Sequence, residues 1–151
     1  MDLRQALPHL LPLAIAWAEA EAKQVARTGA ALTPAEEQIA RAVGVQKPEL
    51  VRIAIVDQLP QPKDAALKLA AQQTGLLGPS MAGLTLGYAV FICRGHNTRR
   101  LVSHELRHVH QYEQNGSIGG FLPVYLKQII DVGYANAPFE ADARAHELRE
   151  T

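Results

Sequence analysis

The sequence predicts an α+β fold with a small mixed sheet. Several segments have the periodicity and end signals of helices, and two runs rich in apolar and β-branched residues, at 50–59 and 84–93, are flanked by proline and glycine. A length of 151 residues with 48% hydrophobic residues is enough to bury one core. We therefore expect a single domain over residues 1–151, with a helical N-terminal part at 1–45.

The first 75 residues predict three helices and one strand. The sequence Thr33-Pro34-Ala35-Glu36 reads as a capping box, because Thr33 and Glu36 can each bond the other's backbone N–H and proline suits the first helical position. A glycine follows each of the three helical segments and marks its end. The predicted elements are a helix at 12–26, a helix at 33–43, a strand at 50–59 and a helix at 64–74.

The second half predicts one strand and three helices. The strand includes Gly87, which is expected to mark a bulge or a close backbone approach. Asn115-Gly116 and Gly133 end two of the helices. The predicted elements are a strand at 84–93, a helix from Asn97 or Thr98 to about Gln114, a helix at 121–132 after a glycine-rich link, and a helix at 138–148.

The charge balance and the single cysteine limit the expected partners and compartment. Fifteen Lys and Arg balance fifteen Asp and Glu, which disfavours a nucleic-acid partner. The sequence contains no apolar run of about 18 residues, so we expect no membrane partner. Cys93 is the one cysteine and cannot form an internal disulfide, which favours a reducing, cytoplasmic location. The oligomeric state is left open.

One motif indicates chemistry. His104-Glu105-Leu106-Arg107-His108 is an HExxH pattern within a segment predicted to be helical. Residues four apart project from the same face of a helix, so both imidazoles can bind one metal ion. Glu105 lies about 100 degrees round the helix, where its carboxylate can reach a water molecule on the metal. We predict His104 and His108 as metal ligands and Glu105 as the general base.

A zinc ion that keeps one position open for substrate needs a third protein ligand. The extended pattern HExxHxxGxxH is absent, because glutamine occupies positions 111 and 114. The acidic candidates therefore lie further along the chain, and they are Asp131, Glu140, Asp142 and Glu147. Glu140 is the best placed, since it stands in the first turn of a new helix that can pack against the HExxH helix.

Two sequence blocks resemble a known family. The run 104–111, HELRHVHQ, followed by 133–143, GYANAPFEADA, is similar to the gluzincin metallopeptidases, especially the very small bacterial and archaeal minigluzincins. Related zinc-peptidase-like domains of unassigned function share the HELxHVxQ and PxExxA blocks. The resemblance extends over about 84–146, less than half of the chain, and its specificity depends on the two blocks together.

The resemblance implies a zinc cleft between an HExxH active-site helix and a C-terminal glutamate helix. In that arrangement His104, His108 and Glu140 would hold Zn²⁺, and Glu105 would act as general base and acid. The run 84–93 would be the edge strand over the cleft, on which an extended peptide adds as a further strand.

The chain departs from the gluzincin pattern at one position, and two of its residues are candidates for the hydrogen-bond donor to the oxyanion. Many gluzincins carry Asp or Asn four residues after the glutamate to support the first histidine, whereas this chain has Arg144, so Asp142 or another carboxylate must take that role. Tyr134 and His110 are near the ligands in sequence and could donate a hydrogen bond to a developing oxyanion. We favour Tyr134, because His110 lies about 240 degrees round the helix from His104.

These observations predict zinc-dependent hydrolysis of a peptide or protein substrate. The N-terminal helices are expected to cover the cleft and to hold the enzyme latent. Two alternatives remain open at this point. One is a catalytically inactive zinc-binding module with a structural or interaction role, and the other is an accessory domain of a toxin or secretion system.

Overall fold

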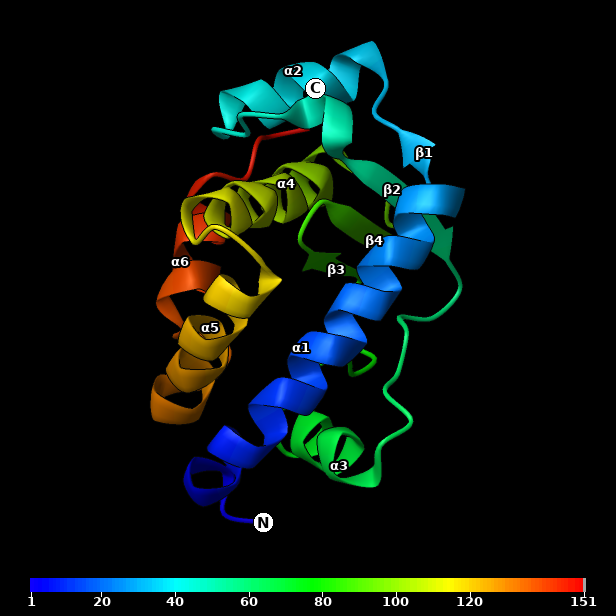
Figure 1. Ribbon diagram of the computed structural model, residues 1–151. Coiled ribbons are helices and arrows are strands. Elements are labelled where there is room, and N and C mark those ends of the chain that lie inside the picture. Colours follow the sequence, from blue (N-terminus) through cyan, green and yellow to red (C-terminus); the bar gives the residue numbers. More distant parts are fainter. Residues whose placement is uncertain (151) are drawn as a thin grey trace.

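A computed structural model describes residues 1–150 and shows a mixed α+β fold (Figure 1), which confirms the predicted class. Six α-helices and a four-stranded sheet lie within the described residues. In chain order the elements are α1 (Leu3–Thr28), β1 (Ala30–Ala31), α2 (Pro34–Ala42), the 3₁₀ turn η1 (Pro48–Leu50), β2 (Arg52–Val56), α3 (Ala65–Thr74), β3 (Gly83–Leu86), β4 (Ala89–Cys93), α4 (Arg99–Gln114), α5 (Ile118–Val132) and α6 (Pro138–Ala145).

The sheet is mixed and has the strand order β1-β2-β4-β3. Strands β2 and β4 are parallel, with Ile53 opposite Val90, while β1 and β3 run antiparallel to their neighbours. The chain crosses from β2 through α3 to the β3–β4 hairpin. Strand β3 is consequently an edge of the sheet.

The prediction of one strand at 84–93 was wrong, because this segment folds back on itself as the hairpin of β3 and β4. Leu86 pairs with Ala89, which leaves a turn of two residues. Gly87 has a φ of +67° there, a conformation that two-residue hairpin turns require and that glycine adopts without strain. The glycine therefore marks a turn and not a bulge within one strand.

Strand β4 separates two hydrophobic clusters. Val90 and Ile92 pack on one face of the sheet with the buried residues of α2 and α4, and Phe91 packs on the other face with residues of α1 and α5. Both faces of the strand are covered, which explains its continuous apolar sequence. The α4 helix lies against β3 as well, so the HExxH segment is held between the sheet edge and the later helices.

Helix α1 is longer than the predicted 12–26, since it begins at Leu3 and continues through Pro8 and Pro12. The two prolines are four residues apart on an exposed face, where carbonyl groups that lose their helical partners can bond water. The Asp2 side chain caps the helix by accepting from the N–H groups of Arg4 and Gln5. No helix in residues 1–150 is both long and apolar enough to cross a membrane.

Helices α5 and α6 differ from the prediction at one end each. The predicted glycine link is partly helical, because α5 begins at Ile118 and Ser117 caps it by accepting from the Gly120 N–H. A β-carbon on Gly120 would lie 2.1 Å from the Asn115 carbonyl oxygen, so this start requires glycine. Helix α6 ends at Ala145, three residues before the predicted end.

Candidate metal centre

Helix α4 carries the HExxH segment and is fixed by its caps and its buried face. Thr98 caps the helix by accepting from the Leu101 N–H, as the sequence suggested. Leu106 and Val109 are completely buried in the core on the α2 side of the sheet. With these residues facing the core, His104 and His108 face α6, which packs against α4.

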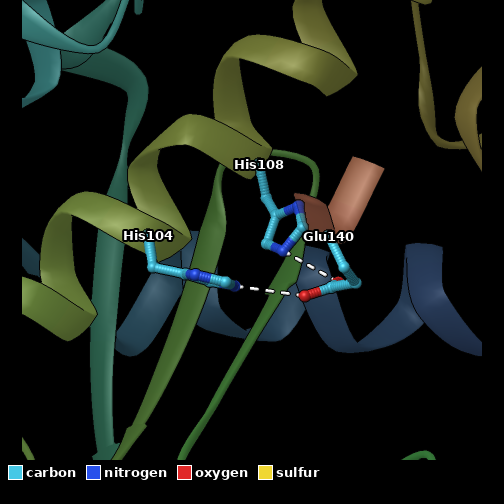
Figure 2. A group of neighbouring side chains, drawn as sticks. All are labelled: His104, His108 and Glu140. Atoms are coloured by element: carbon cyan, nitrogen blue, oxygen red, sulfur yellow. Dashed lines mark hydrogen bonds and ion pairs between the residues drawn. The ribbon is translucent and has the colours of Figure 1, made fainter. Parts of the chain in front are cut away.

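The structure brings the side chains of the three predicted ligands together, as Figure 2 shows. The Nε2 atom of His104 lies 3.2 Å from Oε1 of Glu140, and the Nε2 atom of His108 lies 3.0 Å from Oε2. Two ligand atoms bound tetrahedrally to one zinc ion are about 3.3 Å apart. The two nitrogen–oxygen distances are near this spacing, and the ligand atoms of the three side chains all lie within 4.8 Å of one another, so the group could hold a metal ion.

Hydrogen bonds fix the orientation of His108. The Gln111 side-chain amide donates to the Phe139 carbonyl and to Asp142, both at 2.9 Å, which turns its oxygen toward His108. That oxygen lies 2.7 Å from Nδ1 of His108 and can only accept, so Nδ1 carries a proton. Nε2 is then the atom left to face Glu140 or a metal ion.

His104 is oriented by a carboxylate from beyond the last helix. The Nδ1 atom of His104 lies 2.8 Å from Oε2 of Glu147, and Arg100 binds the other oxygen of the same carboxylate. The chain reaches this position because α6 ends at Ala145 and the following residues turn back toward α4, where the Leu148 N–H bonds Ser103. Both histidines thus have Nδ1 engaged and Nε2 directed at one carboxylate.

The expected support of His104 comes from Glu147 and not from Asp142. Asp142 instead accepts two hydrogen bonds from the Arg107 guanidinium and one from Gln111, so it supports His108 through Gln111. These contacts from Arg107 lower the pKa of Asp142. Glu147, which the sequence offered as a reserve ligand, lies behind His104 and does not belong to the three-residue cluster.

Glu105 lies on the sheet side of the cluster. The Thr85 hydroxyl of β3 is 2.8 Å from Oε1 of Glu105, and a β-carbon on Gly83 would lie 2.9 Å from Oε2. Burial raises the pKa of Glu105 above its ordinary value, against the lowering effect of the two histidines. The carboxylate is therefore confined next to β3 and is more basic than an exposed glutamate.

The His-His-Glu cluster places ionisable side chains in a buried position. Glu140 is 2% exposed and His108 is 6% exposed. Burial favours the neutral imidazole, but the hydrogen bond to Glu140 and its charge outweigh this effect and raise the pKa of His108 to about 9. Burial likewise opposes ionisation of Glu140, yet the hydrogen bonds from His104 and His108 hold its pKa well below the ordinary value. The ionised carboxylate is thus matched to positive charge.

Two tyrosines border the cluster, and only one of them was predicted. The Tyr125 hydroxyl of α5 donates to Oε2 of Glu140 at 2.8 Å. Tyr134 lines the same cavity as Glu105 and Glu140, and burial together with these carboxylates raises its pKa. Tyr125 gave no signal in the sequence, since it falls within an apolar helix. His110 faces elsewhere, as expected, and bonds the Gly44 carbonyl.

A cavity of about 140 Å³ adjoins the cluster. Its wall includes Glu105, His108 and Glu140 together with part of α1. Helix α2 packs against α4 and belongs to the core cluster on the opposite face of the sheet. Of the N-terminal part at 1–45, α1 is thus the segment that lines the cavity.

Comparison with known proteins adds no relative: no family model matches the chain, and neither the curated proteins nor the solved structures contain a match. The fold and the site define a small α+β protein with a buried His-His-Glu cluster that could hold a metal ion.

Proposed function

We propose that His104, His108 and Glu140 bind one Zn²⁺ ion and that the protein is a zinc-dependent peptidase of the minimal gluzincin type. The observation that carries the proposal is the direction of the two imidazoles, since Gln111 and Glu147 engage Nδ1 and leave both Nε2 atoms facing one carboxylate. Two imidazoles and a glutamate are the donor set of catalytic zinc sites that keep a fourth position open.

The chemistry at this site is hydrolysis of an amide. When bound, zinc supplies a Lewis acid that lowers the pKa of water to about 7 and polarises a carbonyl oxygen. Glu105 accepts the proton of the water that attacks the carbonyl carbon and delivers it to the nitrogen of the departing amine. Thr85 holds the Glu105 carboxylate, and Tyr134 donates a hydrogen bond to the oxygen that becomes negative.

The peptide substrate would add to the edge of the sheet at β3. The Cys93 N–H bonds the Ala82 carbonyl, and because bonded and non-bonded pairs alternate, the main-chain groups of Gly83 and Thr85 point away from β4. The Tyr112 hydroxyl donates a hydrogen bond to the Thr85 carbonyl oxygen at 3.1 Å, so this carbonyl already has a partner. An extended peptide would therefore pair at Gly83, beside Glu105.

Measuring the bound metal tests the proposal without knowledge of the substrate. Elemental mass spectrometry of the purified chain should give about one zinc per chain, with strong loss in Glu140→Ala and in the isosteric variant Glu140→Gln. Glu105→Gln should retain the zinc and lose hydrolysis of peptides. Wild-type protein that takes up no added zinc would overturn the proposal, and full hydrolytic activity in Glu105→Gln would overturn the peptidase assignment.

A second candidate is a zinc-binding module without catalysis. Glu147 and Asp142 already join the end of the chain to α4, and a metal ion at Glu140 would strengthen the same attachment. This candidate predicts that zinc raises the melting temperature while peptides remain intact, even after α1 is shortened.

A further inference from the structure

A second cleft lies where the second half of α1 approaches the sheet, with which α1 makes contact at β2 and β4 (Figure 1). Its volume of about 670 Å³ falls within the range of roughly 300–1,000 Å³ that is typical of small-molecule sites. Its wall comes from α1, η1, β2, the turn between β3 and β4, the end of α4 and the start of α5. Among the described residues, Tyr112 is the only one that also lines the cavity beside the metal centre. The cleft is therefore a separate candidate site.

Three basic side chains line this cleft. Lys23 belongs to α1, Lys47 precedes η1, and Arg52 begins β2. Within residues 1–150, the ion pairs that lysine and arginine form with carboxylates involve other residues, so these three have no such partner. The fold thus brings positive charge from three separate segments to one cleft.

Arg52 is held by neutral groups. Its Nη1 atom donates to the carbonyl oxygens of Glu49 and Val51 at 2.9 and 2.8 Å. Its Nε and Nη2 atoms have no hydrogen-bond partner within residues 1–150. The side chain is partly buried, and a guanidinium that has lost water without gaining a counter-ion costs free energy. Its remaining N–H groups match the paired oxygens of a carboxylate or a phosphate.

The acidic residues of the wall do not cancel this charge. Glu113 already has partners for both carboxylate oxygens, since Oε1 accepts from the Gln46 N–H and Oε2 accepts from the Lys47 N–H and the Tyr88 hydroxyl. Glu19 of α1 is the other acidic residue in the wall, and it is exposed to solvent. Three basic residues thus face two acidic ones, and one of the acidic pair is engaged by the wall itself.

Apolar side chains form much of the remaining wall. Leu50 is 48% exposed although it is a large apolar residue, and it lines the cleft together with Tyr88 and Ile118. An apolar group that covers these side chains would remove them from water, which is favourable. The cleft therefore offers apolar contact next to its basic side chains.

We propose that this cleft binds a small organic anion, whose carboxylate or phosphate group contacts Lys23, Lys47 and Arg52 and whose apolar body covers the apolar part of the wall. Arg52 supplies the directed hydrogen bonds, and the two lysines add charge from the opposite segments. The inference does not depend on the proposed zinc-peptidase function, because none of the three predicted metal ligands lines the cleft.

Three naphthalene compounds test the inference on the full chain: 2-naphthyl phosphate, 2-naphthoate and the neutral 2-naphthol. Calorimetry should show that at least one of the two anions binds at a single site. The neutral compound should bind about tenfold or more weakly, because it lacks the charged hydrogen bonds. The anion that binds more tightly identifies the preferred group as phosphate or carboxylate.

Substitutions in the wall locate the binding. Ala26→Trp fills the cleft from α1 and should abolish binding, whereas Ala20→Trp, at an exposed position of α1 outside the cleft, should preserve it. Lys47→Gln should weaken binding by about threefold or more, because one charged contact is lost. Lys68→Gln is the matched control, since it makes the same change of net charge at an exposed position of α3.

Several outcomes would overturn the inference. Binding of neither anion, or equal affinity for 2-naphthol, would show that the basic side chains recognise no anion. Undiminished affinity in Ala26→Trp would place the binding elsewhere, and equal losses in Lys47→Gln and Lys68→Gln would indicate general charge attraction only. The affinity should be the same with and without added zinc. Binding that requires zinc would place the anion at the metal centre, which would overturn this inference and leave the proposed function standing.

Discussion

At the scale of single residues, the metal-binding geometry depends on the side chains that hold His104, His108 and Glu140 as well as on these three residues themselves. Gln111 is the best example, because its amide is held by two acceptors and therefore fixes the proton of His108 on Nδ1. A histidine with an undefined tautomer would present a usable Nε2 lone pair for only part of the time. The second layer of contacts thus sets how well the cluster binds metal.

Replacing Gln111 with leucine should weaken zinc binding by about 10- to 100-fold, because Nδ1 of His108 loses its acceptor. Competition with a chromophoric chelator measures this loss. Gln114→Leu is the matched control, since Gln114 is exposed at the end of the same helix. Unchanged affinity in Gln111→Leu would show that Gln111 does not orient the ligand.

The close approach of Gly83 to the Glu105 carboxylate leads to a separate prediction. In Gly83→Ala the new methyl group would lie 2.9 Å from Oε2 of Glu105, which is closer than real side chains approach, so the buried carboxylate must shift. We expect peptide hydrolysis to fall about tenfold or more while the zinc content stays at that of the wild type. Gly119→Ala, where the nearest atom is 3.7 Å away, should leave both unchanged. A variant that keeps full activity would contradict the role of Glu105.

At the scale of elements, the sequence predicted best where the ends of a segment are set locally. The capping box of Thr33 and Glu36 forms as expected, and α2 ends within a residue of the prediction. The two strands of the hairpin were missed because the apolar run on both sides of Gly87 is continuous, and only the pairing of Leu86 with Ala89 reveals the turn. Strand β1 was missed because two alanines carry no pattern.

The same distinction applies to the site. The spacing of His104 and His108 follows from helix geometry, so their common face could be predicted. The contact of Glu147 with His104 and that of Tyr125 with Glu140 could not, since each depends on how separate segments of the chain pack together. Residues that act through tertiary packing leave no local signal.

Helix α1 yields a prediction of its own. Deleting residues 1–11 removes Leu3, Leu7 and Leu10 from the cavity wall but keeps the buried Ala18 and Val25 in the core. We expect the shortened chain to hydrolyse an unstructured protein such as casein several-fold faster, because access to the cavity widens as its α1 wall shortens. Rates measured for both forms, with melting curves as a control for folding, check this. An equal rate would show that α1 is a wall and not a cover.

At the scale of the whole molecule, the cluster lies where separately packed parts meet. Leu106 and Val109 of α4 belong to the core cluster with α2, whereas Tyr112 of α4, Tyr125 and Phe139 belong to the cluster with α1 and α5. Glu140 of α6 contacts both sides through the two histidines and Tyr125. A metal ion bound to these residues would therefore couple α4 to α6 across the two cores.

This coupling predicts that zinc stabilises the entire fold. A ligand present at 100 times its dissociation constant adds about 2.7 kcal/mol to the free energy of unfolding, which corresponds to a rise of about 5–10 °C in the melting temperature of a chain of this size. Calorimetry should show this rise on addition of zinc and its reversal by a chelator. Glu105→Gln should respond like the wild type, because Glu105 holds no metal, whereas Glu140→Gln should not respond. A wild-type melting temperature that ignores zinc would mean that the three side chains form only an ion-paired cluster, with Glu140 neutralised by the histidines themselves.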